Sequence, residues 1–427
     1  MWVWIEPLDV LMFRDSRPFS GGETHRARSL FPPNPLTFLG AVRAKLLEQA
    51  LSEIGRDFNE YNRYCREQDV DGDSEELESL KKRFGFGTDP GKLHLRGPFL
   101  ARREASIQDL FFPLPFDLLK SKEREGKKGR EIDRPVPLQP LEDEFHHHAA
   151  WDEQWPAGAL PLWNFEEGAK EATGYWLNAN GLKNYLEGGS ASPEWFTKAG
   201  DLYDREQRAG IKLQAGQRTV EQGMLYVAEF IRLRSEHGFL LDVELEGDAD
   251  GSAVEPLKRG ILQLGGEARG CRHHGLDGEP QGIQELRELK IADAIDGSGR
   301  FKLYLASPAI FKNGWLPDFI DRDRLKGNLK GSQAQVRLIA AAVGKPLPIG
   351  GWDLARNRPK TLCYAVPPGS VYFFELEDGS VEDIWKTFHF TSKLQEMTTD
   401  NELARYARIG FGLTFVGYWE YCQPKGG

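Results

Sequence analysis

Cysteine is scarce in this sequence, with four residues in 427, and no two of them form a C-x-x-C pair. This scatter argues against a disulfide framework or a zinc site and indicates buried free thiols. No apolar run approaches the ~20 residues needed to cross a bilayer. The first residues, MWVWIEPLDV, lack the basic start and small-residue cleavage site of a signal peptide, so we expect a cytoplasmic protein.

Motifs of catalysis are also missing. The sequence has no G-x-x-x-x-G-K-[ST], no G-x-S-x-G and no H-E-x-x-H. LGGE resembles half of the palm signature of polymerases, but Glu267 is followed by Ala268 and Arg269 instead of a second metal-binding carboxylate. Three consecutive histidines at 146–148 cannot share one face of a helix or strand. We therefore expect no catalytic residue, no metal and no cofactor.

The charge distribution is uneven. A net charge of −10 argues against general attraction to nucleic acid, although a local basic groove remains compatible with it. Between Leu11 and Leu47 the balance reverses, because six basic residues accompany only Asp15 and Glu23. The six are Arg14, Arg17, Arg26, Arg28, Arg43 and Lys45.

The first elements are well marked. Residues 1–13 alternate as a strand does, and a helix should begin at the N-cap Asn34 with Pro35 in its first turn and end near Gly55. Arg43 lies beside the apolar stripe of this helix. Two interpretations of Arg43 stand, a buried structural ion pair and a ligand contact.

The rest of the chain suggests one plan used twice. Residues 218–247 predict a hairpin, preceded by a loop that carries Arg208 and Lys212. Residues 256–275 predict a helix, a glycine turn and a strand. The last third repeats this plan with a strand within 301–315, a strand pair within 360–377, a helix over 392–408, and a glycine turn and strand over 409–421. We expect an α+β fold of two ferredoxin-like (RRM-like, βαββαβ) modules, each with a Gly-rich loop before its last strand. The modules span 1–290 and 291–427, and polar insertions at about 57–92 and 120–200 interrupt the first, with a charged loop at 120–134.

The two glycine turns are the most informative motifs. They are LGGEARG, which holds Gly265, Gly266 and Arg269, and RIGFGLTFVG, which holds Gly410 and Gly412. Glycine permits positive φ and close approach of a ligand, and successive N–H groups in such turns suit phosphates. Phe411, between the glycines of the second turn, would suit stacking on a base. Alternatively, the glycines only end a helix.

Together these segments resemble a family. PLDVLMFRDSRPF, SLFPPNPLTFLGAVRAKLL, GIKL with RTVEQGMLY, LGGEARG, GSVYFFEL and GFGLTFVG occur in the order expected of the CRISPR-associated RAMP superfamily. Within it the chain is most similar to the Cas-five-like third subunits of the type III-B Cmr complex. The resemblance covers most of the chain except the two insertions.

The resemblance implies a non-catalytic subunit of an antiviral effector complex. Such a subunit caps the guide RNA (crRNA) at its 5′ handle and bridges the large polymerase-like subunit to the stacked backbone RAMP subunits. By matching motif, the expected RNA contacts are Arg14, Arg17, Ser29, Asn34, Thr37, Arg43, Arg218, Glu221, Gly265, Gly266, Arg269, Gly410, Phe411, Gly412 and Thr414. The start of the helix at Asn34 would offer free N–H groups to a phosphate.

Two rival functions remain open. One is a metal-independent endoribonuclease that processes guide RNA, with His25 as the general base. The other is a scaffold that binds only proteins, in which the glycine turns are purely structural. RNA cleavage that depends on His25 would support the first. RNA affinity that is insensitive to charge reversal at Arg14 and Arg17 would support the second.

Overall fold

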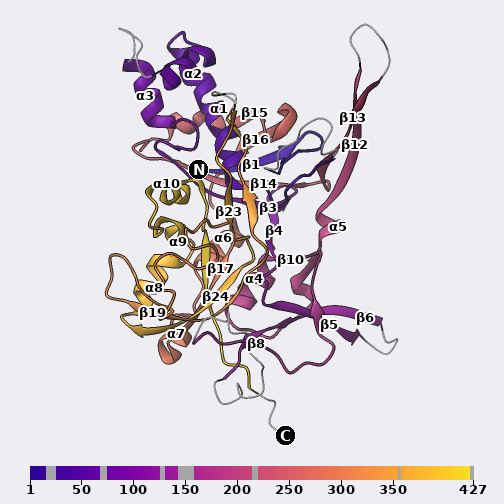
Figure 1. The fold of residues 1–427 in the computed structure, drawn as a ribbon, viewed down its shortest axis with the longest axis vertical. Coiled ribbons are helices and arrows are strands. Elements are labelled where there is room, and N and C mark those ends of the chain that lie inside the picture. The colour runs from indigo at the N-terminus through magenta and orange to yellow at the C-terminus, as the bar shows by residue number, and fades with distance from the viewer. Residues whose placement is uncertain are drawn as a thin grey trace.

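Two antiparallel sheets form the body of the protein. The computed structural model describes residues 1–15, 26–67, 75–125, 130–142, 158–213, 220–353, 356 and 358–423 (Figure 1). The larger sheet has the order β11 (Phe196–Lys198), β10 (Tyr175–Asn178), β4 (Ile107–Pro113), β3 (Leu93–Arg103), β14 (His237–Leu245), β1 (Trp2–Pro7), β16 (Gly270–Gly275) and β15 (Arg259–Gln263). The smaller has the order β18 (Lys326–Asn328), β19 (Gln335–Ala342), β24 (Val371–Asp378), β17 (Arg300–Leu305) and β25 (Thr414–Tyr418).

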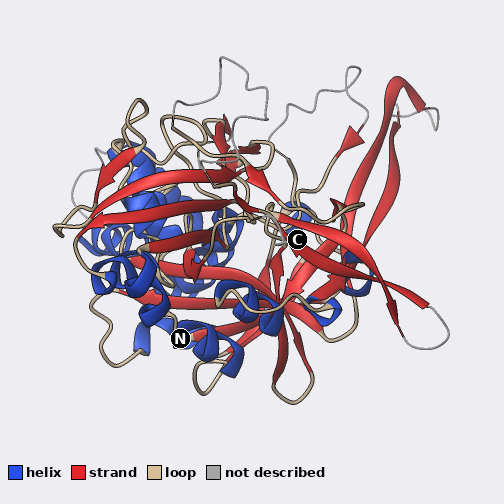
Figure 2. Ribbon diagram, turned by 90° about the horizontal axis from the view of Figure 1, so that it is seen from below, coloured by secondary structure: helices blue, strands red, loops and turns tan. Residues whose placement is uncertain are grey.

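Two long ribbons leave this body on the same side (Figures 1 and 2). One pairs β12 (Tyr203–Leu213) with β13 (Val220–Leu233), and β2 (Arg26–Ala27) runs parallel to β13 at its base. The other pairs β5 (Leu118–Glu125) with β6 (Arg130–Pro137), and β9 (Lys170–Glu171) adds to β5. Shorter ladders join β7 (Gln139–Pro140) to β8 (Leu162–Trp163), β20 (Leu347–Ile349) to β23 (Cys363–Ala365), and β21 (Trp352–Asp353) to β22 (Arg358–Pro359).

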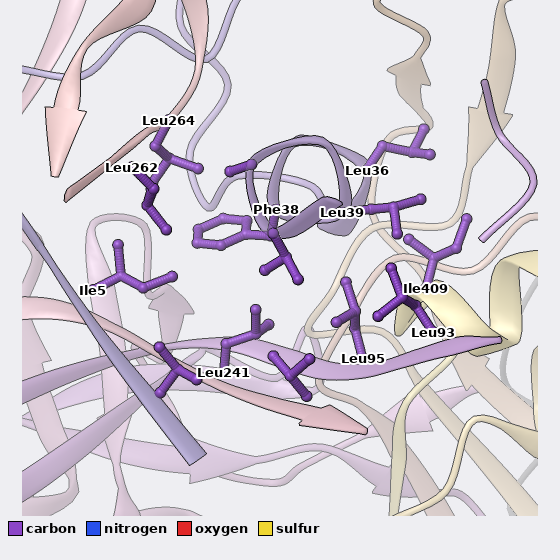
Figure 3. Packing of buried hydrophobic residues seen from close by; sticks show 14 of the residues in the cluster. Ile5, Leu36, Phe38, Leu39, Leu93, Leu95, Leu241, Leu262, Leu264 and Ile409 are labelled. Carbon is purple, nitrogen blue, oxygen red and sulfur yellow. The ribbon is translucent and has the colours of Figure 1, made fainter. Parts of the chain in front are cut away.

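The longest helix, α1 (Pro35–Glu53), packs its apolar side on the large sheet. Figure 3 shows Phe38 of this helix above Ile5 and Leu241, with Leu262 and Leu264 to one side of the helix and Ile409 to the other. The predicted start at Asn34–Pro35 is confirmed. Pro35 suits the first turn because its missing N–H would have had no partner there.

The other helices are shorter. They are α2 (Phe58–Glu67), α3 (Glu75–Phe84), α4 (Ala179–Leu186), α5 (Ala199–Leu202), α6 (Gln281–Arg287), α7 (Ala292–Ser298), α8 (Val381–Phe388), α9 (Lys393–Glu396) and α10 (Asn401–Ala404). Short 3-10 turns include η3 (Ser252–Leu257) and η5 (Arg405–Ile409). In the described part of the chain, no helix is long and apolar enough to cross a membrane.

Several predictions about pairing are wrong. The two strands predicted within 218–247 exist as β13 and β14, but they do not pair with each other. β13 pairs with β12, whereas β14 lies between β3 and β1 in the large sheet. The segment predicted as a helix before the first glycine turn is strand β15, which pairs with β16. Pairing is decided by packing between distant segments, which the local pattern does not record.

Predictions for the polar segments also need correction. Of the segment 120–134, expected to be a loop, residues 120–125 and 130–134 belong to strands β5 and β6. The polar segment 57–92 contains α2 and α3. Residues 208–213, also expected to be a loop, continue β12. The helix predicted over 392–408 is divided into α9, α10 and η5. In contrast, β17, β24 and β25 lie where the sequence predicts strands.

The hydrophobic cores join the two halves of the chain. The core under α1 includes Ile310, Ala365 and Phe411 from the C-terminal third. A second core packs Trp2 and Trp4 of β1 with Phe373 and Phe415 of the smaller sheet. The predicted boundary near residue 290 therefore does not separate two independent cores, and the domain division remains a prediction.

Candidate nucleic-acid interface

The first glycine turn, between β15 and β16, presses against the loop that follows β1. The Gly266 N–H donates to the Met12 carbonyl at 2.7 Å. A Cβ on Gly265 would lie 2.4 Å from the same oxygen, and Gly265 has φ +79°. Glu267 and Ala268 also adopt positive φ. Only glycine at 265 allows the turn and the loop to approach this closely.

The loop after β1 is held in turn by the base of the β12–β13 ribbon. Leu11 and Ile231 exchange two backbone hydrogen bonds of 2.8 Å. The buried Ser29 hydroxyl donates to the Glu229 carbonyl at 2.6 Å and accepts from the Phe13 N–H. Arg14 forms an isolated bridge with Ser29 and its side chain is exposed. Ser29 thus fixes the loop, and Arg14 lies on its outer side.

Three arginines converge where these segments meet. Arg208 comes from β12, Arg232 from β13 and Arg269 from the glycine turn. The guanidinium carbons of Arg208 and Arg269 lie 5.1 and 4.9 Å from the ring centroid of Phe230. All three arginines face Asp9, at N–O distances of 3.7, 3.1 and 3.8 Å. We call Arg208, Arg232 and Arg269 the arginine cluster.

Carboxylates partly neutralise the arginine cluster. Glu206 contacts both Arg208 and Arg232 at 2.8 Å, and Glu267 contacts Arg269 at 2.7 Å. Hydrogen bonds from Arg208 and then Arg232 hold the pKa of Glu206 below its usual range. Burial opposes ionisation of Asp9, but hydrogen bonds from the Val10 N–H and Arg232 still lower its pKa. The carboxylates of Asp9 and Glu206 are therefore ionised at neutral pH. Within the described ranges, the buried Arg269 Nε has no hydrogen-bond partner.

The second glycine turn lies inside the protein. Phe411 is completely buried in the core under α1 and packs edge-on against Tyr406. A Cβ on Gly410 would lie 2.9 Å from the Gly97 carbonyl of β3, and Gly412 donates to the Pro308 carbonyl. The buried Thr414 hydroxyl donates to the Phe388 carbonyl. In this conformation Phe411 presents no face to a base, which corrects the expectation of stacking.

The residues around α1 divide into two groups. Arg43 donates to the carbonyls of Phe84, Gly87 and Asp89, so its guanidinium anchors the segment after α3. The structure thus favours the structural interpretation of Arg43, with backbone carbonyls as partners in place of an acid. Among the described residues, Asn34 caps no N–H group and its buried Oδ1 has no hydrogen-bond partner. Thr37 follows in the first turn, half-buried.

Some predicted residues lie outside the described part. Arg17, His25 and Arg218 belong to segments that the structure does not describe, and of Glu221 only its backbone position on β13 is described. The described residues that do come together are Arg14, Ser29, Gly265, Gly266 and Arg269. Within the described ranges, no group of His, Cys, Asp and Glu residues could hold a metal ion.

Comparison with known proteins decides the family. Residues 3–419 match the sequence model of the family described as "CRISPR-associated protein (Cas_Cmr3)". The chain belongs to this family. Membership confirms the resemblance to the third subunits of the type III-B Cmr complex that the motifs predict. No curated protein matches the chain.

Solved structures similar to this Cas_Cmr3 chain are distant. Two are cryo-EM structures of the type III-B Cmr-β complex bound to cognate target RNA, one also with AMPPnP. Their matched chains are 17% identical, have TM-scores of 0.47 and 0.46, and the matches cover 96% of this chain and 95% of theirs. A chain of a Csm3–Csm4 subcomplex of the type III-A interference complex matches at 13% identity and a TM-score of 0.33. The match covers 89% of this chain and 93% of that one.

Sequence reasoning missed part of the arginine cluster in this Cas_Cmr3 protein. It placed Arg208 on a loop and did not select Arg232 or Asp9. The available signal was the alternation in EFIRLR, which puts Arg232 and Arg234 on one face of a strand. Glu206 and Arg208 alternate in the same way on the neighbouring strand. The register Asp204–Arg232, which brings these faces together, is a property of the folded ribbon.

Proposed function

We propose that this Cas_Cmr3 protein is a non-catalytic, RNA-binding subunit of a type III-B CRISPR effector complex that caps the 5′ handle of the guide RNA. In this role it bridges the large polymerase-like subunit to the backbone RAMP subunits. Family membership supports the assignment to the complex. The arginine cluster supports RNA as the ligand.

The arginine cluster is the observation that carries the proposal. An acidic chain brings together two arginines of the β12–β13 ribbon and one of the glycine turn, which presses against the loop that carries the exposed Arg14. Guanidinium groups match phosphate oxygens with paired donors, so an RNA backbone is a suitable ligand. Phosphates would take over the positions of the carboxylates of Asp9 and Glu206. The adjoining glycine turn adds backbone N–H groups at the same surface.

The proposed contact surface uses the predicted residues selectively. It contains Arg14, Arg17, Arg218, Glu221, Gly265, Gly266 and Arg269, with Arg208 and Arg232 added. Asn34 and Thr37 at the start of α1 form a second candidate contact for a phosphate. Arg43, Ser29, Gly410, Phe411, Gly412 and Thr414 are assigned to the scaffold, because their polar groups are satisfied or their side chains are buried.

The strand orders support the two predicted ferredoxin-like modules. In the first, β3, β14, β1 and β16 are neighbours, and in the second β19, β24, β17 and β25 are neighbours. If the four strands of each module are numbered 1 to 4 in chain order, their order across the sheet is 2-3-1-4 in both modules, as in a βαββαβ unit. In the first module η3 replaces the second helix. In the second module, the first helix of the unit is missing, because residues 306–334, which are all described, contain no helix.

The test is RNA binding by full-length protein. The double variant Arg208→Ala/Arg269→Ala should weaken binding of a single-stranded guide RNA about 100-fold, since each lost charged hydrogen bond contributes about 1.5 kcal/mol. The slope of log affinity against log salt should fall by ~0.7 for each phosphate contact removed. Arg14→Gln, at an exposed position of the loop, is a second variant outside the arginine cluster. Arg287→Ala, which removes surface ion pairs with Glu279 and Glu288, is the matched control.

The competing functions predict different results. If the protein is a scaffold that binds only proteins, all four samples will bind the RNA equally weakly. If it is an endoribonuclease, the wild-type protein will cleave the RNA and His25→Ala will not. A guide RNA with a shuffled handle separates capping from general RNA binding, because only capping predicts a weaker complex with the shuffled RNA.

A further inference from the structure

A hairpin in the C-terminal third has one buried and one exposed face. It is made by β20, β21, β22 and β23, and we call its described residues, 345–353, 356 and 358–366, the 345–366 hairpin. On its inner face, Ile349 and Ala365 belong to the core under α1. Arg356 donates to Asp353 at 3.0 Å, and its guanidinium carbon lies 4.7 Å from the Phe86 ring centroid. The hairpin is thus held firmly against the N-terminal half.

The outer face is apolar. Alternation along β23 turns Tyr364 away from the core that Ala365 enters, and Leu362 follows on the same side. The exposed fractions are 51% for Trp352, 45% for Leu362 and 63% for Tyr364. Pro359, opposite Trp352 in the ladder, is also exposed. A ribbon covered on one side normally has polar residues on the other. Clustered exposed apolar side chains indicate an interaction surface.

The surroundings of this face are basic. Residues 345–366 contain four basic residues, Lys345, Arg356, Arg358 and Lys360, and one acid, Asp353, in a chain of net charge −10. Asp353 is buried and paired with Arg356. Lys345 and Arg358 are exposed and form no ion pair with any residue in the described ranges. A partner would therefore meet an apolar centre with a positive rim.

We propose that the outer face of the 345–366 hairpin docks another protein, whose contact surface is apolar at its centre and acidic at its rim. Trp, Tyr and Arg are the residues that contribute most to protein interfaces, and here they occur together on a rigid support. This inference does not depend on the proposed role in RNA binding.

The residues favour a protein over a nucleic acid as the occupant. Leu362 and Pro359, the other exposed apolar residues of this face, offer no ring for a base to stack on. Of the four basic residues, Arg356 is already engaged by Asp353 and Phe86. Burial lowers the pKa of Lys360, which lies near Arg43. Only Lys345 and Arg358 remain to meet phosphates, too few for the basic groove of a single-strand binder.

The first test is hydroxyl-radical footprinting of the full-length protein in two states. One is the isolated chain, and the other is the complex purified from its native cells through a tag on this chain. Oxidation of Trp352 and Tyr364 should be at least fivefold slower in the complex and should stay slow after nuclease treatment. Trp163, on β8 and equally exposed at 51%, serves as the reference for reactivity. Single-stranded polyuridylate added to the isolated chain should protect neither residue.

Variants then identify the contact. Trp352→Ser/Tyr364→Ser and, separately, Lys345→Glu/Arg358→Glu should reduce the recovery of one defined subunit about tenfold in native mass spectrometry, whereas Trp163→Ser should not. A photo-crosslinker at position 362 should label an acidic segment of that subunit. Equal oxidation of Trp352 and Tyr364 in both states would overturn the proposal. Protection that nuclease removes or that polyuridylate reproduces would overturn it in favour of nucleic acid.

Discussion

Arg43 illustrates how a basic residue near the predicted interface can serve the fold alone. Its guanidinium donates to one backbone carbonyl at the end of α3 and to two beyond it, and burial lowers its pKa. Arg43→Met should therefore destabilise the protein by about 3 kcal/mol, because hydrogen bonds to charged groups contribute more than neutral ones. Denaturant unfolding measures this change. Lys45→Met, which breaks one exposed pair with Glu48, should cost less than ~0.5 kcal/mol.

The same variant separates the two interpretations of Arg43. Under conditions where it is fully folded, Arg43→Met should bind guide RNA as the wild-type protein does. Reduced affinity with unchanged stability would make Arg43 a ligand contact instead.

Gly265 has no room for a side chain. Gly265→Ala would place a Cβ 2.4 Å from the Met12 carbonyl oxygen, at a backbone φ of +79°. We therefore expect the free energy of unfolding to fall by about 3 kcal/mol and the RNA complex to become weaker. Gly251→Ala is the control, because Gly251 has a similar φ of +71° but no atom within 4 Å of the added Cβ. Gly251→Ala should lower the free energy of unfolding by only about 1 kcal/mol. Equal losses, measured by urea unfolding, would show that the contact with Met12 is unimportant.

At the scale of elements, a buried lysine joins α4 to the smaller sheet. The Lys302 Nζ of β17 lies 3.4 Å from the ring centroid of Tyr185, whose hydroxyl donates to Asp117 at 2.7 Å. Burial lowers the pKa of Lys302 to about 8 and raises that of Asp117 to about 6. Asp117→Asn should cost about 3 kcal/mol, since it leaves a buried cation without its counter-charge. The free energy of unfolding of the double variant Lys302→Met/Asp117→Asn should lie within about 1 kcal/mol of the wild-type value.

The same pair predicts a pH dependence. Between pH 8 and the ordinary lysine value of 10.5, the unfolded chain holds more protons at Lys302, so its contribution to stability rises with pH. Between 3.8 and 6, the folded chain holds more protons at Asp117, so its contribution falls as pH rises. The unfolding free energy of the wild type minus that of the double variant should therefore fall between pH 3.8 and 6 and rise between pH 8 and 10.5. A difference independent of pH would contradict the assignment.

The elements also show what the sequence can predict. The helix α1 and strands β1, β17 and β25 were predictable because their apolar periodicity and their Pro and Gly signals are local. The pairing of β13 with β12 and the insertion of β14 beside β1 were not, because they depend on contacts between distant segments. For the site, the turn at 265–266 was predictable from its glycines. The burial of Phe411 was not, since it results from packing against β3 and Tyr406.

At the scale of the whole molecule, the shared cores predict a single cooperative unit. Residues from both sides of position 290 fill the two cores that support the large sheet. We expect one calorimetric unfolding transition, with equal van't Hoff and calorimetric enthalpies. Residues 1–290 expressed alone should lack a cooperative transition, because Ile310, Ala365 and Phe411 would be missing from the core. Two separate transitions in the full chain would instead support the predicted division into independent domains.

The most direct test of the central claim is to identify the RNA that this protein holds in its native cells. The tagged protein would be purified and the RNA that accompanies it sequenced from its 5′ ends. We expect short RNAs with one common 5′ leader, obtained together with partner subunits. These RNAs should be lost in Arg208→Ala/Arg269→Ala but not in Arg287→Ala. No RNA, or RNA with random 5′ ends, would contradict guide capping and favour a subunit that binds only proteins.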